Sequence, residues 1–215
     1  MNKTMCVGSR GVNHPAWNES FYPEDLPEEW RLSYYSNEFR SLLLLHDDIK
    51  SLPDDELIEW LEELDADFAL LYGVEFDSFF ELSLLPSLLK QRLQALVCDL
   101  TVLQLALLLK GVVPLPENTP LYLRCLQGVP NDEQMQQIRR RGWRFCWQGN
   151  QSYSEGCAPV LFLDGRLSLR ELRAQLQLFL ASDAIESDKL LLVLEGQPPS
   201  IEYLRQCQIL VDLLA

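Results

Sequence analysis

Residues 121–142 read LYLRCLQGVPNDEQMQQIRRRG and show the structural unit that repeats along this chain. The largely apolar run Leu121–Leu126, in which Arg124 is the one charged residue, predicts a buried strand. Asn131 then predicts the N-cap of a helix, and Gly142 follows the expected helix end at Arg141. A buried strand followed by a helix is the repeating unit of parallel α/β folds.

Eight apolar runs of this kind occur in the chain, and most are followed by an amphipathic stretch. The runs are Met5–Gly8, Ser41–Leu45, Phe68–Val74, Ala95–Cys98, Leu121–Leu126, Trp143–Trp147, Val160–Leu163 and Leu190–Leu194. Runs that are largely apolar, without an alternation of apolar and polar residues, predict a parallel sheet covered on both faces. An open doubly wound sheet and a (β/α)8 barrel both have this pattern, and eight units favour the barrel.

The expected fold is therefore a lean α/β barrel, a (β/α)8 TIM-like barrel formed as a single domain by residues 1–215. The length leaves about 27 residues per unit, against about 31 in a typical barrel. The stretch Gln148–Ala158 carries no helix signal, so a loop is expected in place of the helix after the sixth strand. An incomplete sheet is the alternative that this length leaves open.

The stretches between the apolar runs predict helices with identifiable ends. Pro53, followed by three acidic residues, predicts the start of one helix, and Ser168 begins another at capping-box spacing. Pro86 is expected to kink or split the helix predicted over residues 78–89. Thr101–Lys110 is apolar on nearly every face, which predicts a well-buried helix.

The chain is strongly acidic. Its 18 Lys and Arg against 32 Asp and Glu give a formal net charge of −14. Such a surface repels phosphate groups, so we expect neither nucleic acid nor a membrane as a partner. Cationic partners, divalent cations and neutral small molecules are compatible with this charge. The longest apolar stretch, Val102–Val113, is interrupted by Gln104 and Lys110 and is too short to span a bilayer.

The cysteines predict a cytoplasmic protein. Six Cys residues are scattered without a CxxC pair, and Cys98, Cys125 and Cys146 lie in apolar runs. This distribution is typical of reduced, buried thiols and offers no paired ligands for a structural zinc ion. The first ten residues lack a basic segment followed by an apolar one, so no secretory signal peptide is expected.

Residues 5–40 contain an ordered series of glycine and aromatic motifs. The series is Gly8-Ser9-Arg10-Gly11, Trp17, Phe21-Tyr22-Pro23, Leu26-Pro27, Trp30, Tyr34-Tyr35 and Phe39. Its order and spacing resemble the opening of the DUF72 (YecE-like) family, in which a Gly-Thr-Ser-Gly-Trp strand end precedes Phe-Tyr-Pro and Tyr-Tyr-x-x-x-Phe. Members of that family are TIM-barrel-like, so the resemblance implies this fold for a divergent, shortened relative. It implies no settled reaction.

The sequence departs from the family pattern at three places. Val12 stands where the family has Trp, and Leu42–Asp47 replaces the Val-Glu-x-Asn pattern of the second strand. Residues 122–128 resemble the family's Tyr-Val-Arg-Leu-His-Gly segment, with Gln127 in place of His. The polar residues that the family directs from its second strand toward a pocket are missing here. This loss raises the hypothesis of a non-catalytic barrel.

Candidate functional residues lie mainly at the carboxyl ends of the predicted strands, where (β/α)8 barrels carry their active sites. Converging carboxylates beside an imidazole can exchange protons or hold a divalent cation. The predicted catalytic residues are His46, Asp47, Glu75 and Asp99. The predicted substrate-binding residues are Arg10, His14, Trp17, Tyr22, Arg124, Gln148, Asp164 and Glu195.

These residue types also have structural interpretations. Carboxylates after a strand often cap the next helix, and an aromatic-rich segment such as that around Trp17 and Tyr22 is typical of a loop packed onto a barrel. The basic run Arg139–Arg141 suits the C-terminal end of a helix.

Two functions are compatible with this pattern. The first is a small-molecule or divalent-metal pocket at the carboxyl ends of the strands, with a weak hydrolase-type activity. The second is a non-catalytic barrel that acts as an interaction or regulatory protein. Self-association as a homo-oligomer, through the surface left by the missing helix, is compatible with both. The sequence contains no GxxxxGK(S/T), GxGxxG, GxSxG or HExxH motif, so it identifies no cofactor.

Overall fold

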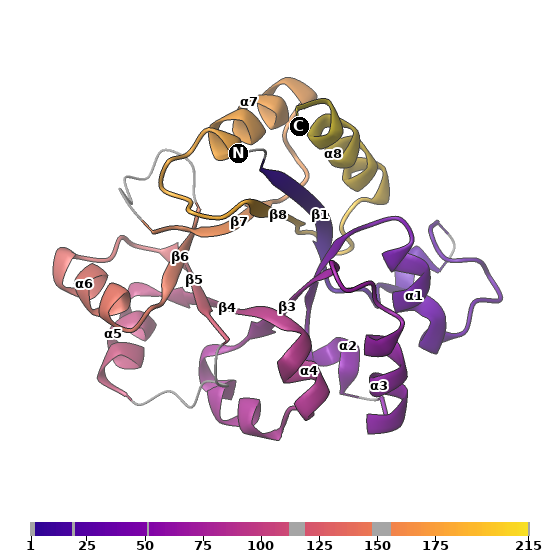
Figure 1. Ribbon diagram of the computed structural model, residues 1–215, viewed down its shortest axis with the longest axis horizontal. Coiled ribbons are helices and arrows are strands. Elements are labelled where there is room, and N and C mark those ends of the chain that lie inside the picture. Colours follow the sequence, from indigo (N-terminus) through magenta and orange to yellow (C-terminus); the bar gives the residue numbers. More distant parts are fainter. Residues whose placement is uncertain (1–2, 19, 51, 112–118, 148–155, 215) are drawn as a thin grey trace.

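A computed structural model describes residues 3–18, 20–50, 52–111, 119–147 and 156–214. The core is a closed barrel of eight parallel strands, which β8 completes by pairing with β1 (Figure 1). The strands are β1 (Thr4–Arg10), β2 (Ser41–Leu44), β3 (Ala69–Val74), β4 (Leu93–Thr101), β5 (Leu121–Gln127), β6 (Arg144–Trp147), β7 (Ala158–Leu163) and β8 (Lys189–Leu194). The predicted (β/α)8 barrel is confirmed, and an open or incomplete sheet is excluded.

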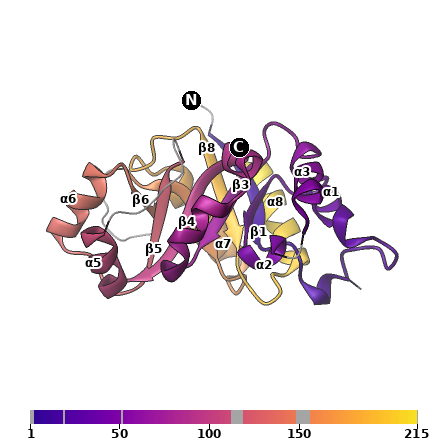
Figure 2. The same cartoon turned by 90° about the horizontal axis from the view of Figure 1, so that it is seen from below.

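Helices cover the outside of the barrel, as the views along and across it show (Figures 1 and 2). The α-helices are α1 (Arg31–Ser36), α2 (His46–Ile49), α3 (Asp54–Glu62), α4 (Ser87–Arg92), α5 (Val102–Lys110), α6 (Asp132–Arg140), α7 (Leu169–Leu180) and α8 (Ile201–Leu214). Three 3₁₀ segments are η1 (Pro15–Trp17), η2 (Glu28–Trp30) and η3 (Phe76–Leu84). The loop predicted over Gln148–Ala158 lies largely outside the described residues, which resume at Gly156.

Two segments show how single residues set the helix boundaries. The helix predicted over residues 78–89 is divided at Pro86, since η3 ends before this proline and α4 begins after it. Asn131 caps α6 as predicted, because its side chain accepts a hydrogen bond from the backbone N–H of Gln134 (2.9 Å). The short helix α2 has too few residues for a periodic signal, and the sequence pattern does not predict it.

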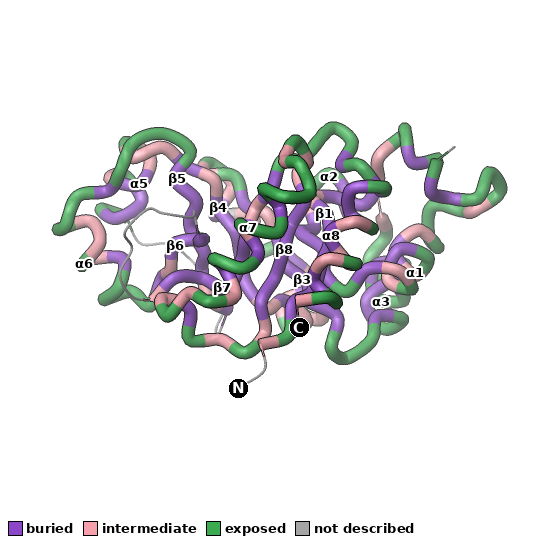
Figure 3. Tube along the Cα trace, turned by 90° about the horizontal axis from the view of Figure 1, so that it is seen from above, coloured by how far each residue is buried: buried purple, intermediate pink, exposed green. Residues whose placement is uncertain are grey.

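The barrel encloses a core of its own, separate from the larger core between the strands and the helices. Alternate residues of each strand point inward, so both faces of a strand must be apolar. Burial follows this arrangement, with the strands buried and the outer helix faces exposed (Figure 3). The inner core consists of Cys6, Leu43, Ala69, Leu71, Ala95, Val97, Tyr122, Cys146, Ala158, Val160, Leu191 and Val193.

Helix α5 is less buried than its composition predicts. Leu105, Leu108 and Leu109 face the barrel and are buried, whereas Leu103 is 79% exposed and Leu107 is 58% exposed. The expectation of a helix buried on nearly every face was wrong, because the described helices form a single layer and the outer face of α5 meets solvent. None of the described helices combines the length and the hydropathy needed to cross a bilayer.

The aromatic N-terminal segment packs onto the barrel. The Tyr35 hydroxyl is fully buried, accepts a hydrogen bond from the Ser9 backbone N–H (2.8 Å) and donates one to the Ser41 carbonyl (3.0 Å). The Trp17 indole stacks on Tyr35 and donates to the Pro199 carbonyl (3.0 Å). The segment thus joins β1, β2 and the loop before α8, in agreement with its structural interpretation.

All six cysteines are buried, as predicted. Burial raises the pKa of the Cys98 and Cys207 thiols to about 12 and that of the Cys125 thiol to about 11. A thiol whose pKa is higher in the folded than in the unfolded state is protonated preferentially in the folded state, and at alkaline pH ionisation favours unfolding. The stability of the fold is unaffected by this ionisation below about pH 9. It decreases as the pH rises from about 9 to 12.

We therefore expect the urea midpoint of unfolding to fall as the pH is raised from 9 to 11. The variants Cys98→Ala and Cys207→Ala should show a smaller fall than the parent, because each removes one thiol that ionises mainly after unfolding. Urea titrations followed by circular dichroism at pH 8, 10 and 11 measure this effect. Equal pH dependence in parent and variants would argue against thiol ionisation as a cause.

Candidate functional site

Four charged residues form the uppermost layer of the barrel interior. Each of them continues the inward-pointing alternation of its strand beyond the residues of the apolar inner core. The four side chains therefore lie directly above that core. Arg10 lies on β1, Asp99 on β4, Arg124 on β5 and Glu195 directly after β8. We call these four residues the ion-pair layer.

Arg124 is the centre of the ion-pair layer. Its Nε and Nη2 donate to the two Asp99 carboxylate oxygens (both 2.8 Å), and its Nη1 and Nη2 donate to the two Glu195 oxygens (2.6 and 2.9 Å). The guanidinium also lies over the Phe162 ring, 4.2 Å from its centroid. Burial acts to lower the pKa of Arg124, but the hydrogen bonds that it donates to Glu195 and Asp99 outweigh this effect and raise that pKa further above its usual value.

Arg10 joins the same two carboxylates from the other side. Its Nη1 donates to Asp99 Oδ2 (2.9 Å) and to Glu195 Oε1 (3.3 Å). All four carboxylate oxygens of the layer therefore accept guanidinium hydrogen bonds, and the two positive and two negative charges cancel. This geometry favours a positioning role for Asp99 over the predicted acid–base role.

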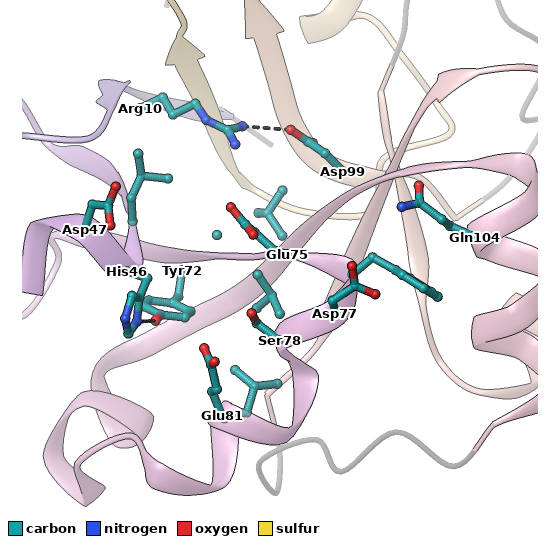
Figure 4. A pocket seen from close by; sticks show the side chains of 16 residues that line it. Arg10, His46, Asp47, Tyr72, Glu75, Asp77, Ser78, Glu81, Asp99 and Gln104 are labelled. Atoms are coloured by element: carbon teal, nitrogen blue, oxygen red, sulfur yellow. Dashed lines mark hydrogen bonds and ion pairs between the residues drawn. The ribbon is translucent and has the colours of Figure 1, made fainter. Parts of the chain in front are cut away.

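A pocket of about 590 Å³ opens beside the ion-pair layer, at the carboxyl ends of β1 to β4 (Figure 4). One wall is η3, and Arg10 and Asp99 form part of the opposite side. The lining residues are Arg10, Leu45, His46, Asp47, Tyr72, Gly73, Val74, Glu75, Phe76, Asp77, Ser78, Glu81, Leu82, Val97, Asp99 and Gln104. The four predicted catalytic residues all line this pocket, together with Arg10.

Tyr72 and His46 form a pair on one side of the pocket. The Tyr72 hydroxyl lies 3.4 Å from His46 Nδ1 (Figure 4). Burial raises the pKa of Tyr72 to about 12, with Glu81 and Asp48 adding to the shift. The phenol is therefore protonated near neutral pH and can donate a hydrogen bond to a ligand.

The carboxylates of the pocket differ in their surroundings. Asp47 accepts a hydrogen bond from Lys50 (2.7 Å), which lowers its pKa, and its side chain is 79% exposed. Glu75, Asp77 and Glu81 have neither an ion pair nor a side-chain hydrogen bond within the part of the chain that the structure describes. These three carboxylates are available to a ligand.

The other predicted substrate-binding residues lie apart from the pocket. Trp17 and Tyr22 are buried in the packed N-terminal segment, where Tyr22 donates to the Val12 carbonyl (2.9 Å). His14 packs edge-on against Trp17 and contacts the Arg10 carbonyl (3.0 Å). Asp164 accepts hydrogen bonds from the backbone and guanidinium of Arg166, in a local turn. Gln148 lies outside the described residues.

Arg124 and Glu195, also predicted to bind substrate, belong to the ion-pair layer. They are not among the residues that line the pocket. Their effect on a ligand in this pocket is therefore indirect, through Asp99 and Arg10, whose side chains they hold.

Asp48 is the structurally important carboxylate of its segment, and sequence reasoning selected its neighbour Asp47. The buried Asp48 side chain accepts hydrogen bonds from three backbone N–H groups, those of Val12 (3.2 Å), Asn13 (3.1 Å) and Leu45 (2.8 Å). It therefore ties the loop after β1 to the start of α2. The sequence feature that could have indicated Asp48 is its position in the first turn of a helix, where carboxylates are favoured.

We expect Asp48→Ala to lower the free energy of unfolding by about 2 kcal/mol, because three backbone donors lose a charged acceptor. Asp47→Ala is the matched control, since Asp47 is exposed and pairs only with Lys50. It should leave the free energy of unfolding nearly unchanged, because an exposed ion pair contributes little to stability. Urea denaturation measures the free energy of unfolding of both variants. Equal losses would contradict the structural role assigned to Asp48.

The described side chains provide no group of three His, Cys, Asp or Glu residues placed to hold a metal ion. A divalent cation finds no set of ligands of the usual number in this part of the chain.

Comparison with known proteins supports the fold. No protein-family model and no curated protein sequence matches the chain. A DUF72 family protein from Thermotoga maritima has a similar structure, with a TM-score of 0.66 at 13% identity over 97% of this chain and 99% of that one. A DUF72 family protein from Enterococcus faecalis V583 gives a TM-score of 0.60 at 9% identity, over 98% of each chain. The resemblance noted in residues 5–40 thus extends, at the level of the fold, over nearly the whole chain.

Proposed function

We propose that this chain binds a small polar molecule in the pocket at the carboxyl ends of β1 to β4. The observation that carries the proposal is a cavity of about 590 Å³ with titratable side chains on the face where (β/α)8 barrels place their sites. This volume lies in the usual range of small-molecule sites. The ion-pair layer gives the pocket a rigid, charge-balanced side.

The pocket also contains groups suited to proton transfer. Glu75 is a carboxylate without a partner among the described residues, and Tyr72 and His46 lie together in the same pocket. A weak hydrolase-type reaction would use Glu75 as the base, since the Asp99 oxygens are occupied by guanidinium groups. The second candidate function is a non-catalytic binding barrel. It is favoured by the neutralisation of Asp99 and Glu195 within the ion-pair layer.

Thermal-shift screening of the parent chain and of Ser78→Trp tests the proposal. Ser78 lines the pocket, so an indole at this position should fill much of it. A ligand at 100 times its Kd should raise the Tm of the parent by about 5–10 °C. The same ligand should leave Ser78→Trp unchanged. A library of small polar molecules without any hit, or with hits that stabilise both proteins equally, would refute the proposal.

A further inference from the structure

The charges that line the pocket do not balance once the ion-pair layer is set aside. The layer cancels its own two positive and two negative charges through short hydrogen bonds. Asp47 is compensated by Lys50. Glu75, Asp77 and Glu81 then remain, and within the described chain they have no cationic partner. The pocket therefore keeps an excess of three negative charges.

The shape of the pocket decides what kind of cation could meet these charges. The described side chains offer no group of three His, Cys, Asp or Glu residues that could hold a single metal ion. The cavity of about 590 Å³ is much larger than one ion requires. An extended molecule can reach several of the carboxylates at once.

The remaining lining suits such a molecule. The Tyr72 and Phe76 rings line the cavity and can pack against the carbon chain or against an ammonium group. The Gln104 side chain lines it from α5 (Figure 4). Arg10 is the single Lys or Arg among the described lining residues, and its Nη1 is held by Asp99 and Glu195.

From these observations we infer that the ligand of the pocket is an organic cation that carries ammonium or guanidinium groups. This inference rests on the proposed function and names its ligand class. An ammonium group beside the wall of Glu75, Asp77 and Glu81 gains Coulomb attraction, and an anion placed there is repelled. The molecule must be long enough to reach from Glu75 to a second carboxylate of η3.

Isothermal titration calorimetry with three four-carbon probes tests the inference. The probes are 1,4-diaminobutane, 1,4-butanediol and succinate, which share a chain length and differ in charge. We expect 1,4-diaminobutane to bind at least about tenfold more tightly than the other two, because only it can pair with two carboxylates. Its affinity should fall when the salt concentration is raised from about 20 to about 300 mM.

Three charge-neutralising variants assign the effect to the pocket. Glu75→Gln and Glu81→Gln should each weaken the binding of 1,4-diaminobutane by about fivefold, because each removes one nearby carboxylate. Glu56→Gln, on the exposed face of α3, changes the net charge by the same amount at a residue that does not line the pocket, and it should leave the affinity unchanged. Thermal unfolding checks that all three variants are folded.

Three results would overturn the inference. They are equal or tighter binding of succinate, no binding of any of the three probes, and the same loss of affinity in Glu56→Gln as in Glu75→Gln. The proposed function can survive this failure. If the thermal-shift screen finds a neutral or anionic ligand that Ser78→Trp blocks, the pocket stands and only its ligand class changes. If Ser78→Trp blocks no ligand of the screen, both the proposed function and the inferred ligand class fail.

Discussion

Replacing Arg124 with methionine should lower the free energy of unfolding by about 3–5 kcal/mol, the usual cost of removing one partner from a buried ion pair. Arg124 supplies four hydrogen bonds to Asp99 and Glu195, and its side chain is only 10% exposed. Without it, Arg10 is the one counter-charge that the two carboxylates keep among the described residues. Urea denaturation followed by circular dichroism measures the loss.

Two further variants show whether the loss comes from uncompensated charge. Arg139→Met removes an exposed arginine at the end of α6 and should cost less than about 1 kcal/mol. The triple variant Arg124→Met, Asp99→Asn, Glu195→Gln should regain part of the stability, because it no longer contains the two carboxylates that lost their counter-charge. A loss below about 1 kcal/mol in Arg124→Met would show that the ion-pair layer is not a structural element.

Replacing Gly8 with alanine should be similarly damaging, with a loss of at least about 3 kcal/mol. A Cβ atom on Gly8 would lie 1.7 Å from the Ser41 carbonyl oxygen and 2.4 Å from its carbon. The two residues are partners in the β1–β2 register, so the strands would have to separate. This close approach explains why the motif Gly8-Ser9-Arg10-Gly11 begins with glycine.

Gly111→Ala is the matched control for this prediction. A Cβ atom at Gly111 would meet only ordinary contacts at 3.8 Å, and its φ of −89° is accessible to alanine. This variant should remain within about 1 kcal/mol of the parent. Thermal unfolding of the two variants side by side makes the comparison. A Gly8→Ala protein as stable as Gly111→Ala would mean that β1 and β2 can move apart easily.

The fold could be predicted because its determinants are local. Each buried parallel strand contains a largely apolar run, and caps such as Asn131 and Ser168 mark the helix starts within a few residues. The exposed face of α5 could not be predicted in the same way. Leu103 and Leu107 are as apolar as the buried Leu105, and only the position of the helix on the barrel separates them.

The sequence predicted where the candidate site lies, but not which of its side chains form ion pairs with one another. The predicted strand ends placed Asp99 and Glu195 on the face of the barrel at the carboxyl ends of the strands. Asp99 and Arg124 are partners in the β4–β5 register, whereas Glu195, which follows β8, reaches Arg124 only because the barrel is closed. Likewise, adjacent Asp47 and Asp48 have the same side chain, and the path of the loop after β1 decides which of them is buried.

A crystal structure of the chain with the strongest ligand from the thermal-shift screen tests the central claim most directly. We expect electron density for the ligand in the pocket, in contact with Tyr72 and Glu75, and an unchanged ion-pair layer around Arg124. A ligand bound elsewhere on the molecule, or one that displaces Arg124 from Asp99 and Glu195, would contradict this claim.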